Sequence, residues 1–252
     1  MRSLGKEGEI MKERDMGYSM PVTAAIYPEP PYLYRGGNIL ICVFQTKEEI
    51  LKNIVPEPLI PAEGNLVHAW INDFRIVDVV HYHEAIISVP VLFRGNPGSY
   101  MAYLYLDSDA AIASGREIWG FPKKEGRFTF SKDGDVITRA VERGGTEVLK
   151  ISVELTKPAS PEAASGLGLP IYCLKLIPSV RKGAPPDVMQ LTATTLQNIT
   201  VHKLIEGNAT LALGGSPADP LYLLEPTAIL KGLYCEVDVD LTYGEVVYDY
   251  QG

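Results

Sequence analysis

Two adjacent lysines, Lys123 and Lys124, directly follow an aromatic and proline-containing run in the stretch REIWGFPKKEG, residues 116–126. A lysine amine attacks a carbonyl only in its neutral form, which near pH 7 requires a pKa roughly three to four units below the usual value of about 10.4. Exclusion of water lowers a lysine pKa in this way, and Trp119, Phe121 and Pro122 are suitable walls for a dry pocket. The stretch therefore contains the residue types of a nucleophilic lysine site.

The spacing of the two lysines limits which of them can react. In an extended segment Lys123 and Lys124 point to opposite faces, so only one of them can enter an apolar pocket. We expect the other lysine to be solvated or paired, with Glu125 as a candidate partner. A KKEG run by itself is more typical of a solvated turn, so the residue types alone leave the catalytic interpretation open.

Most of the chain around this stretch has the pattern of β-strands. Runs rich in β-branched and aromatic residues predict strands over residues 38–45, 85–93, 100–106, 127–130, 136–141, 147–155, 174–177 and 246–248. Asp133-Gly134 and Gly144-Gly145 stand at hairpin spacing, and residues 96–98 mark another reversal. These features predict a mainly β fold with a few short helices, an antiparallel meander closed into a barrel or a double-layer sheet around a small-molecule pocket.

Two short helices are expected beside the strands. Thr46, with Glu49 three positions later, forms a capping-box pattern, and Pro56 ends that segment. A second helix is predicted over residues 109–117, with Ser108 as its N-cap. This second helix leads the chain directly into the lysine pair.

The composition places limits on the class of protein. The 252 residues are 46% hydrophobic and 21% charged, as in an ordinary globular protein. The formal net charge of −8 and the lack of a clustered basic run argue against a nucleic-acid partner. The charged N-terminal stretch has no apolar segment, so we expect no signal peptide, no membrane span and a cytoplasmic location. We predict a flexible arm over residues 1–20, one domain over residues 21–252, and buried structural thiols at the three widely spaced cysteines.

The segment LDSDAAIASGREIWGFPKKEG, residues 106–126, resembles the signature of the acetoacetate decarboxylase family, in which a Gly-Arg-Glu run leads through an aromatic-proline step to a lysine pair. The likeness extends over nearly the whole chain, through PPYLYRG, IVPEPL, IISVPVLFRG, YMAYLYLD, YCLKLIP, ITVHK and VVYDY. This resemblance implies a homo-oligomeric enzyme that acts on a small keto acid or ketone. The chemistry implied needs no metal and no diffusible cofactor.

By this resemblance, Lys123 is the nucleophile that forms a Schiff base with the ketone. The resulting iminium accepts the electron pair released when carbon dioxide leaves a β-keto acid of the acetoacetate type. Glu84, in the run HYHEAIISVP, matches one of two glutamates that the family carries near the pocket, and we expect it to carry protons. We expect Arg116 and Glu117 to hold the lysine strand in place and Lys124 to support it, without reacting themselves.

Two positions depart from the family pattern. The family's N-terminal arginine falls on Gly37, and its other glutamate falls on Trp70. Arg35 lies on the same side of an extended strand as position 37, so we expect Arg35 to bind the substrate carboxylate instead. Trp70 joins Trp119 and Phe121 as an expected substrate-contacting aromatic residue. Its size and low polarity favour an aryl or longer acyl substrate over acetoacetate.

Other functions stay open beside decarboxylation. A lysine iminium also serves an aldolase or a dehydratase that acts on a larger ketone. A second alternative is a non-catalytic small-molecule-binding barrel that keeps the apolar pocket. A possible metal cluster consists of His81, His83 and Glu84, with His68 or His202 as a further ligand. The two histidines of the strand share a face, but Glu84 would point to the opposite face. Half-buried histidines with satisfied hydrogen bonds are the interpretation that we favour, without a metal.

Overall fold

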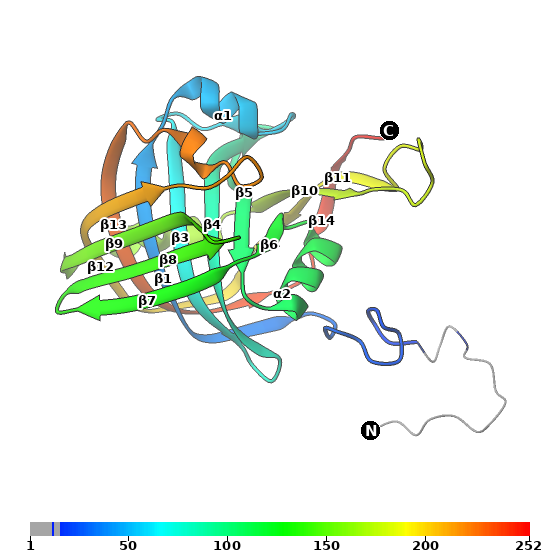
Figure 1. Cartoon of the computed structure of the whole chain (residues 1–252), viewed down its shortest axis with the longest axis horizontal. Helices are drawn as coiled ribbons and strands as arrows, with labels where there is room; N and C mark the ends of the chain where they lie inside the picture. Colours follow the sequence, from blue (N-terminus) through cyan, green and yellow to red (C-terminus); the bar gives the residue numbers. More distant parts are fainter. Residues whose placement is uncertain (1–11, 13–15) are drawn as a thin grey trace.

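The structure is a computed structural model, which describes residue 12 and residues 16–252, and strands dominate it (Figure 1). The elements in chain order are β1 (Tyr32–Gln45), α1 (Glu48–Ile54), β2 (Ile60–Pro61), β3 (Leu66–Ile76), β4 (Val80–Phe93), β5 (Asn96–Leu106), α2 (Asp109–Ser114), η2 (Gly115–Trp119), β6 (Lys123–Glu125), β7 (Arg127–Asp133), β8 (Val136–Arg143), β9 (Thr146–Pro158), η3 (Pro161–Gly168), β10 (Ile171–Ile177), β11 (Val188–Thr194), β12 (Gln197–Leu213), η4 (Leu221–Leu224), β13 (Ala228–Leu241) and β14 (Glu245–Asp249). Here η2 is a π-helix, and η3 and η4 are 3-10 helices.

The strands form one sheet of 14 strands, whose main path runs β14-β11-β10-β5-β4-β3-β1-β13-β12-β9-β8-β7. The predicted mainly β fold with a few short helices is confirmed. Most neighbours are antiparallel, as expected for a meander, but β5 pairs in parallel with both β6 and β10. The sheet is not closed into a barrel. It folds over so that β9 packs against β1 and β3, which is the double-layer form of the prediction (Figure 1).

The predicted turns are correct at two of the three places. Asp133 pairs with Val136 and Arg143 pairs with Thr146, so both glycine-containing dipeptides form hairpin turns. The reversal expected at residues 96–98 lies two residues earlier, because Phe93 already pairs with Asn96. The two residues between them have φ values of 51° and 82°, the left-handed conformation that a two-residue hairpin requires.

The helix predicted after residue 46 is present as α1, but its capping box is wrong. Lys47 is the N-cap residue and makes no side-chain capping hydrogen bond. The Thr46 hydroxyl instead donates to the backbone carbonyl of Leu224, far along the chain. The helix ends at Ile54, with Val55 as its C-cap directly before Pro56, as predicted.

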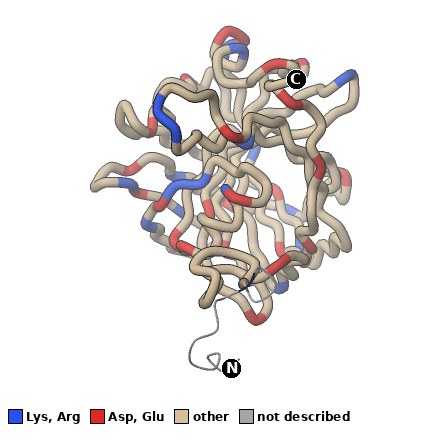
Figure 2. The backbone as a smooth tube through the Cα atoms, turned by 90° about the vertical axis from the view of Figure 1, so that its right-hand side faces the viewer, with Lys and Arg blue, Asp and Glu red and all other residues tan. Residues whose placement is uncertain are grey.

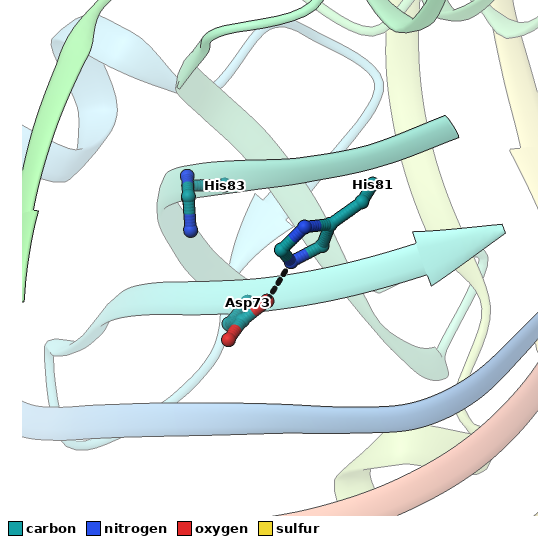
Figure 3. A group of neighbouring side chains, drawn as sticks. All are labelled: Asp73, His81 and His83. Atoms are coloured by element: carbon teal, nitrogen blue, oxygen red, sulfur yellow. Dashed lines mark hydrogen bonds and ion pairs between the residues drawn. The ribbon is translucent and has the colours of Figure 1, made fainter.

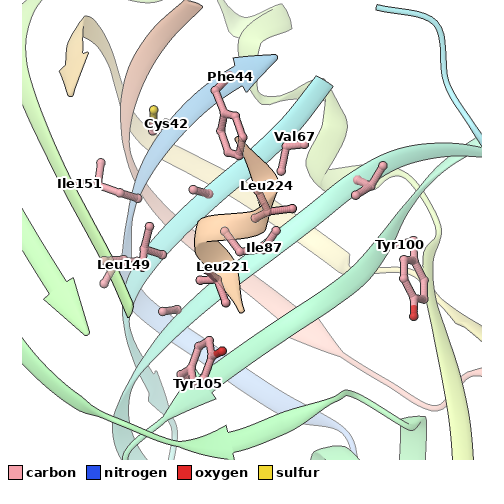
Figure 4. Packing of buried hydrophobic residues seen from close by; sticks show 14 of the residues in the cluster. Cys42, Phe44, Val67, Ile87, Tyr100, Tyr105, Leu149, Ile151, Leu221 and Leu224 are labelled. Carbon is pink, nitrogen blue, oxygen red and sulfur yellow. The ribbon is translucent and has the colours of Figure 1, made fainter. Parts of the chain in front are cut away.

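Alternate residues of the central strands separate into two apolar clusters. Leu40, Cys42 and Phe44 of β1 face the space between the two layers. Figure 4 shows η4 inserted there, with Leu221 and Leu224 pointing among the side chains of the strands. Burial of these side chains fixes the second layer on the first.

The opposite face of the same strands carries the second cluster. Ile39, Ile41 and Val43 of β1 belong to it, together with side chains of β3, β4, β5 and β13. The candidate site lies on this face. The three cysteines, Cys42, Cys173 and Cys235, are buried and free, as predicted.

The N-terminal arm predicted over residues 1–20 lies mostly outside the described residues. Ser19 is buried, and its hydroxyl donates to the Tyr27 carbonyl over 3.0 Å, so the packed structure includes residue 19. Within the described part of the chain, no helix is long and apolar enough to span a membrane. In the view of Figure 2, basic and acidic residues are interspersed along the backbone.

Candidate active site

The lysine pair occupies β6, a short strand that lies beside β5 in parallel, with Lys123 opposite Leu104. The two side chains point to opposite faces, as the strand parity predicts. Lys123 is buried, with 6% of its surface exposed. Lys124 is paired, but its Nζ lies 2.9 Å from the Asp219 carboxylate, and the expected pairing with Glu125 is wrong.

The segment before β6 makes room for the Lys123 side chain. Ser108 caps α2 by accepting a hydrogen bond from the Ala111 amide, as predicted. The helix predicted over residues 109–117 is α-helical only to Ser114 and continues as the π-helix η2. A Cβ atom at Gly115 would lie 2.5 Å from Lys123 Cδ, a separation that van der Waals contact excludes. A side chain at position 115 would therefore displace the side chain of Lys123.

Lys123 faces Glu84 inside the protein. Its Nζ lies 3.3 Å from Glu84 Oε1, and both side chains are almost fully buried. The same Nζ lies 5.4 Å from the ring centroid of Phe121 and 5.7 Å from that of Tyr82. The amine is thus held between one carboxylate and two aromatic rings, away from bulk water.

These residues line a cavity of about 420 Å³. Trp70, Phe121, Lys123 and Glu84 all contribute to its wall, so four of the expected site residues are brought together. Most of the remaining wall is apolar, and part of it comes from η3. The other lining residues used below are Tyr34, Ile39, His68, Asn72, Phe74, Tyr82 and Lys231.

Arg35 does not line the cavity, so the structure does not place it where the expected contact with the substrate carboxylate would need it. Its Nη1 donates to Asp240 Oδ1 over 2.7 Å and to the carbonyls of Tyr34 and Val239. The parity argument failed because Gly36 has φ of +66° and the pairing of β1 with β13 shifts between residues 34 and 37. A bulge of this kind breaks the alternation of side chains along a strand.

Trp119 is buried and does not line the cavity, so the structure does not place it where the expected contact with substrate would need it. The indole Nε1 donates to the Thr242 carbonyl over 2.9 Å. The ring lies 6.0 Å from that of Phe121, centroid to centroid, and packs edge-on against Tyr32. Trp119 therefore supports Phe121, which does contact the cavity.

Arg116 contacts the lysine strand, as its place at the helix end suggests, whereas Glu117 contacts the N-terminal segment. Arg116 Nη1 donates to the carbonyl of Lys123 over 3.1 Å. The Glu117 carboxylate accepts a hydrogen bond from the Tyr27 hydroxyl. These contacts tie η2 to β6 on one side and to the N-terminal segment on the other.

Asn72 is a polar residue of the site that the sequence analysis missed. It is 1% exposed, lines the cavity, and neither atom of its side-chain amide has a hydrogen-bond partner in the described structure. It lies directly opposite Glu84 in the pairing of β3 with β4. An unpartnered buried amide costs about 1–3 kcal/mol, so the position calls for a functional explanation. Alternation from Trp70, two residues earlier on the same strand, is the signal that places it in the wall.

Further titratable groups lie in the same wall. Tyr34 and Tyr82 hydroxyls are 3.2 Å apart, and burial, followed by the charge of Glu84, raises the pKa of both above the usual range. Burial, with a smaller effect of Lys231, lowers the pKa of His68 to about 4. Both tyrosines and His68 are therefore neutral near pH 7.

The histidines of β4 lie on the opposite face from Glu84, as the parity argument predicts. His81 Nε2 is 2.5 Å from Asp73 Oδ1 (Figure 3). His83 Nδ1 is 2.7 Å from Asp107 Oδ2, so both imidazoles have hydrogen-bond partners. Of the described residues, Asp73, His81 and His83 have ligand atoms within 4.8 Å of one another and could hold a metal. Asp73 takes the place that the metal alternative gave to Glu84.

A buried lysine beside a carboxylate, in an apolar cavity of a double-layer sheet, is an arrangement suited to enzymes that react through a lysine imine. A family model described as acetoacetate decarboxylase (ADC) matches residues 19–251. The chain belongs to the acetoacetate decarboxylase family, and it is a carbon–carbon lyase of the carboxy-lyase type, with its exact reaction open.

Relatives and a solved structure agree with this membership. The chain is 32% identical over 244 residues to the acetoacetate decarboxylase of Burkholderia multivorans, covering 96% of this chain and 98% of the relative. It is 30% identical over 239 residues to acetoacetate decarboxylase 2 of Mesorhizobium japonicum, covering 94% and 91%. The crystal structure of acetoacetate decarboxylase from Legionella pneumophila superposes with a TM-score of 0.88 at 28% identity, covering 99% of this chain and 100% of that one.

Proposed function

We propose that this protein decarboxylates a β-keto acid of the acetoacetate type through an imine on Lys123. The observation that carries the proposal is the buried contact of 3.3 Å between Lys123 Nζ and Glu84 Oε1 inside the apolar cavity. Nucleophile and proton carrier stand within reach of one substrate atom, which is the geometry that covalent catalysis with proton transfer needs.

The reaction begins when the neutral amine of Lys123 attacks the keto carbon and the keto oxygen leaves as water. The protonated imine then withdraws electrons from the neighbouring carbon. The bond between that carbon and the carboxylate breaks, carbon dioxide leaves, and the electron pair forms the double bond of an enamine. Glu84 delivers a proton to the enamine carbon, and water releases the ketone and regenerates the amine.

The wall of the cavity favours the step that loses carbon dioxide. The carboxylate is charged before the step, and carbon dioxide is neutral after it. Trp70 and Phe121 contribute aromatic surface to the wall of the cavity that contains Lys123. A negative charge next to such surface is poorly solvated, so its disappearance in the transition state is favoured.

A second candidate reaction, aldol addition or dehydration on a larger ketone, is favoured by the size of the site. The cavity of about 420 Å³ is in the range of pockets that hold drug-sized ligands, whereas acetoacetate has only seven non-hydrogen atoms. Trp70 adds aromatic surface that acetoacetate would leave unused. The same imine on Lys123 would serve this reaction, with Glu84 again carrying the proton.

Borohydride trapping tests the proposal. The protein is incubated with acetoacetate and, separately, with an aryl ketone, then reduced and digested, and any mass adduct is assigned to a peptide. We expect the adduct on Lys123 and release of carbon dioxide from acetoacetate in the same tubes. An adduct without carbon dioxide would favour the aldolase or dehydratase, and no adduct from folded protein would favour a binding protein.

The adjacent lysine provides a matched control for this experiment. Lys123→Ala removes the nucleophile and should abolish the adduct and lower turnover by at least about 10³-fold. Lys124→Ala removes a partly exposed partner of the buried Asp219, which keeps Arg143 at 3.2 Å. This variant should keep the adduct, with turnover reduced by less than about tenfold. Normal turnover in Lys123→Ala would overturn the mechanism.

A further inference from the structure

Asn72 is the feature of the cavity that the proposed reaction does not use. Four residues of the described structure carry buried side-chain polar atoms without a partner, and Asn72 and Glu84 are the two that line the cavity. The Glu84 atom faces the amine of Lys123. Neither amide atom of Asn72 has such a neighbour, and a buried amide without a partner costs free energy unless a ligand uses it.

The surroundings of Asn72 explain why no protein group reaches its amide. Along β3 its neighbours on the cavity side are Trp70 and Phe74, and across the sheet it pairs with Ile39 of β1. Its other cross-strand neighbour is Glu84, already turned towards Lys123. Asn72 therefore lies in the wall of the space that a substrate held on Lys123 would enter.

The amide can distinguish one class of oxygen from another. Its Nδ2 donates hydrogen bonds and its Oδ1 accepts them. A hydroxyl group can accept from Nδ2 and donate to Oδ1, so it satisfies both atoms. A carboxylate or a keto oxygen can only accept hydrogen bonds. Such an oxygen would leave Asn72 Oδ1 without a donor and would place its own lone pairs against those of Oδ1.

The position of Asn72 sets where on the substrate this hydroxyl lies. Glu84 contacts the amine of Lys123, and Asn72 lies one strand further on, at a spacing of about 4.8 Å. Three bonds of about 1.5 Å each separate a keto carbon from the oxygen of a hydroxyl on its β-carbon, so the extended chain spans about 3.8 Å. A hydrogen bond of about 2.9 Å from that oxygen covers the remaining distance to the Asn72 amide. A β-hydroxy ketone can therefore place its keto carbon at Lys123 and its hydroxyl at Asn72.

We propose that Asn72 is a specificity-determining residue that binds the hydroxyl of a β-hydroxy ketone whose keto carbon lies at Lys123. The inference rests on the proposed function for the position of the keto carbon. The substrate class includes 3-oxo acids with a hydroxyl on carbon 5, which the enzyme would decarboxylate. It also includes the β-hydroxy ketones of aldol and dehydration chemistry.

Calorimetric titration with two matched aryl ketones tests the assignment. The probes are 4-hydroxy-4-phenylbutan-2-one, as separate enantiomers, and 4-phenylbutan-2-one, which lacks the hydroxyl. We expect one enantiomer of the hydroxy ketone to bind the wild-type protein about tenfold more tightly than the deoxy ketone. In Asn72→Leu, which removes both polar atoms at similar volume, the two ketones should bind within about twofold of each other.

Two further variants make the result specific. Asn53→Leu, at an exposed position of α1, should keep the tenfold preference. Lys123→Met cannot form an imine, yet it keeps Asn72 and should keep the preference in reversible binding. The preference in Lys123→Met without any borohydride adduct in wild type would support the role of Asn72 while overturning the proposed function.

Two outcomes would overturn the role of Asn72 itself. Equal binding of the two ketones by the wild-type protein would mean that water alone satisfies the amide. If folded Asn72→Leu still binds the hydroxy ketone more tightly than the deoxy ketone, another group binds the hydroxyl. Circular dichroism of each variant establishes folding before the titration.

Discussion

Position 37 decides how the cavity receives a negatively charged substrate. The resemblance to the family puts an arginine there, and this chain has glycine. A Cβ atom on Gly37 would lie 2.8 Å from Phe74 Cδ1, so the Phe74 ring occupies the space that a side chain at position 37 needs. Phe74 in turn packs edge-on against Tyr34 and lies beside Tyr82. The absence of an arginine at position 37 and the presence of the Phe74 ring in the cavity wall are thus one structural feature.

This coupling predicts that a single substitution cannot restore an arginine. Gly37→Arg should lower the free energy of unfolding by about 1–3 kcal/mol, because the new side chain overlaps Phe74. In the double variant Gly37→Arg with Phe74→Ala, the arginine has room to enter and should raise kcat/KM for acetoacetate about tenfold, the effect of one charged hydrogen bond. Urea denaturation and a carbon dioxide assay measure the two effects. A gain in Phe74→Ala alone would show that space, not charge, limits acetoacetate.

At the scale of elements, the junction between α2 and β6 positions the reactive amine. The α-helix widens into the π-helix η2 at Gly115, and the Phe121 amide donates back to the Gly115 carbonyl over 3.0 Å. Single π-helical turns often occur at functional sites. Here the turn lets the Lys123 side chain pass against a residue without a Cβ.

Gly115→Ala should therefore impair catalysis more than folding. Alanine is the better helix former, but its Cβ would displace the Lys123 side chain, and a shift of about 1 Å in a reacting group can cost 10²-fold in rate. We expect about a 10²-fold loss of kcat and slower borohydride trapping. Gly168→Ala, at the end of η3 where a Cβ meets only an ordinary contact, is the matched control. Full activity of Gly115→Ala would contradict the positioning role.

Local alternation accounts for the parts of the site that the sequence predicts. It places Lys123 and Lys124 on opposite faces and separates Glu84 from the histidines, because each of these pairs lies in an uninterrupted strand. The same argument fails at Arg35, where Gly36 interrupts the alternation, and such a bulge has no reliable sequence pattern.

Contacts between distant parts of the chain were beyond the sequence patterns. Thr46 bonds to η4 instead of capping α1, and that partner is 178 residues away. Strand β13 lies between β1 and β12, and nothing in its own residues specifies this place. Trp119 has the right residue type for a pocket wall, but its contact with the Thr242 carbonyl turns it into a support. Side-chain type predicts chemistry, whereas tertiary partners decide which side chains perform it.

At the scale of the whole molecule, the open ends of the sheet favour self-association. Strand β14 is the last strand at one end, and Val246 and Tyr248 on it are 53% and 40% exposed. Strand β7, at the other end, carries charged residues that disfavour edge pairing, among them Arg127 and Lys132. We predict a homo-oligomer, with a mass by light scattering of at least twice the 27.6 kDa of one chain. A mass of one chain at all concentrations would contradict it.

The stability of the whole fold should depend on pH through His68. Burial, with a smaller effect of Lys231, lowers its pKa from 6.5 to about 4 in the folded protein. Between these values the unfolded chain binds the proton and the folded one does not, so stability is lost as the pH falls through this window. The full effect is roughly 3 kcal/mol.

Comparison with His68→Gln, which carries no titrating group at this position, isolates the contribution of His68 to the pH dependence of the free energy of unfolding. The free energy of unfolding of wild type minus that of the variant should be constant above about pH 7.5. It should then fall steadily between pH 6.5 and 4, because only the wild-type chain gains a proton on unfolding. Urea denaturation at several pH values measures both curves. Parallel curves across this window would mean that protonated His68 is tolerated inside the cavity, which would open the wall beside Lys231 to an anionic substrate group at low pH.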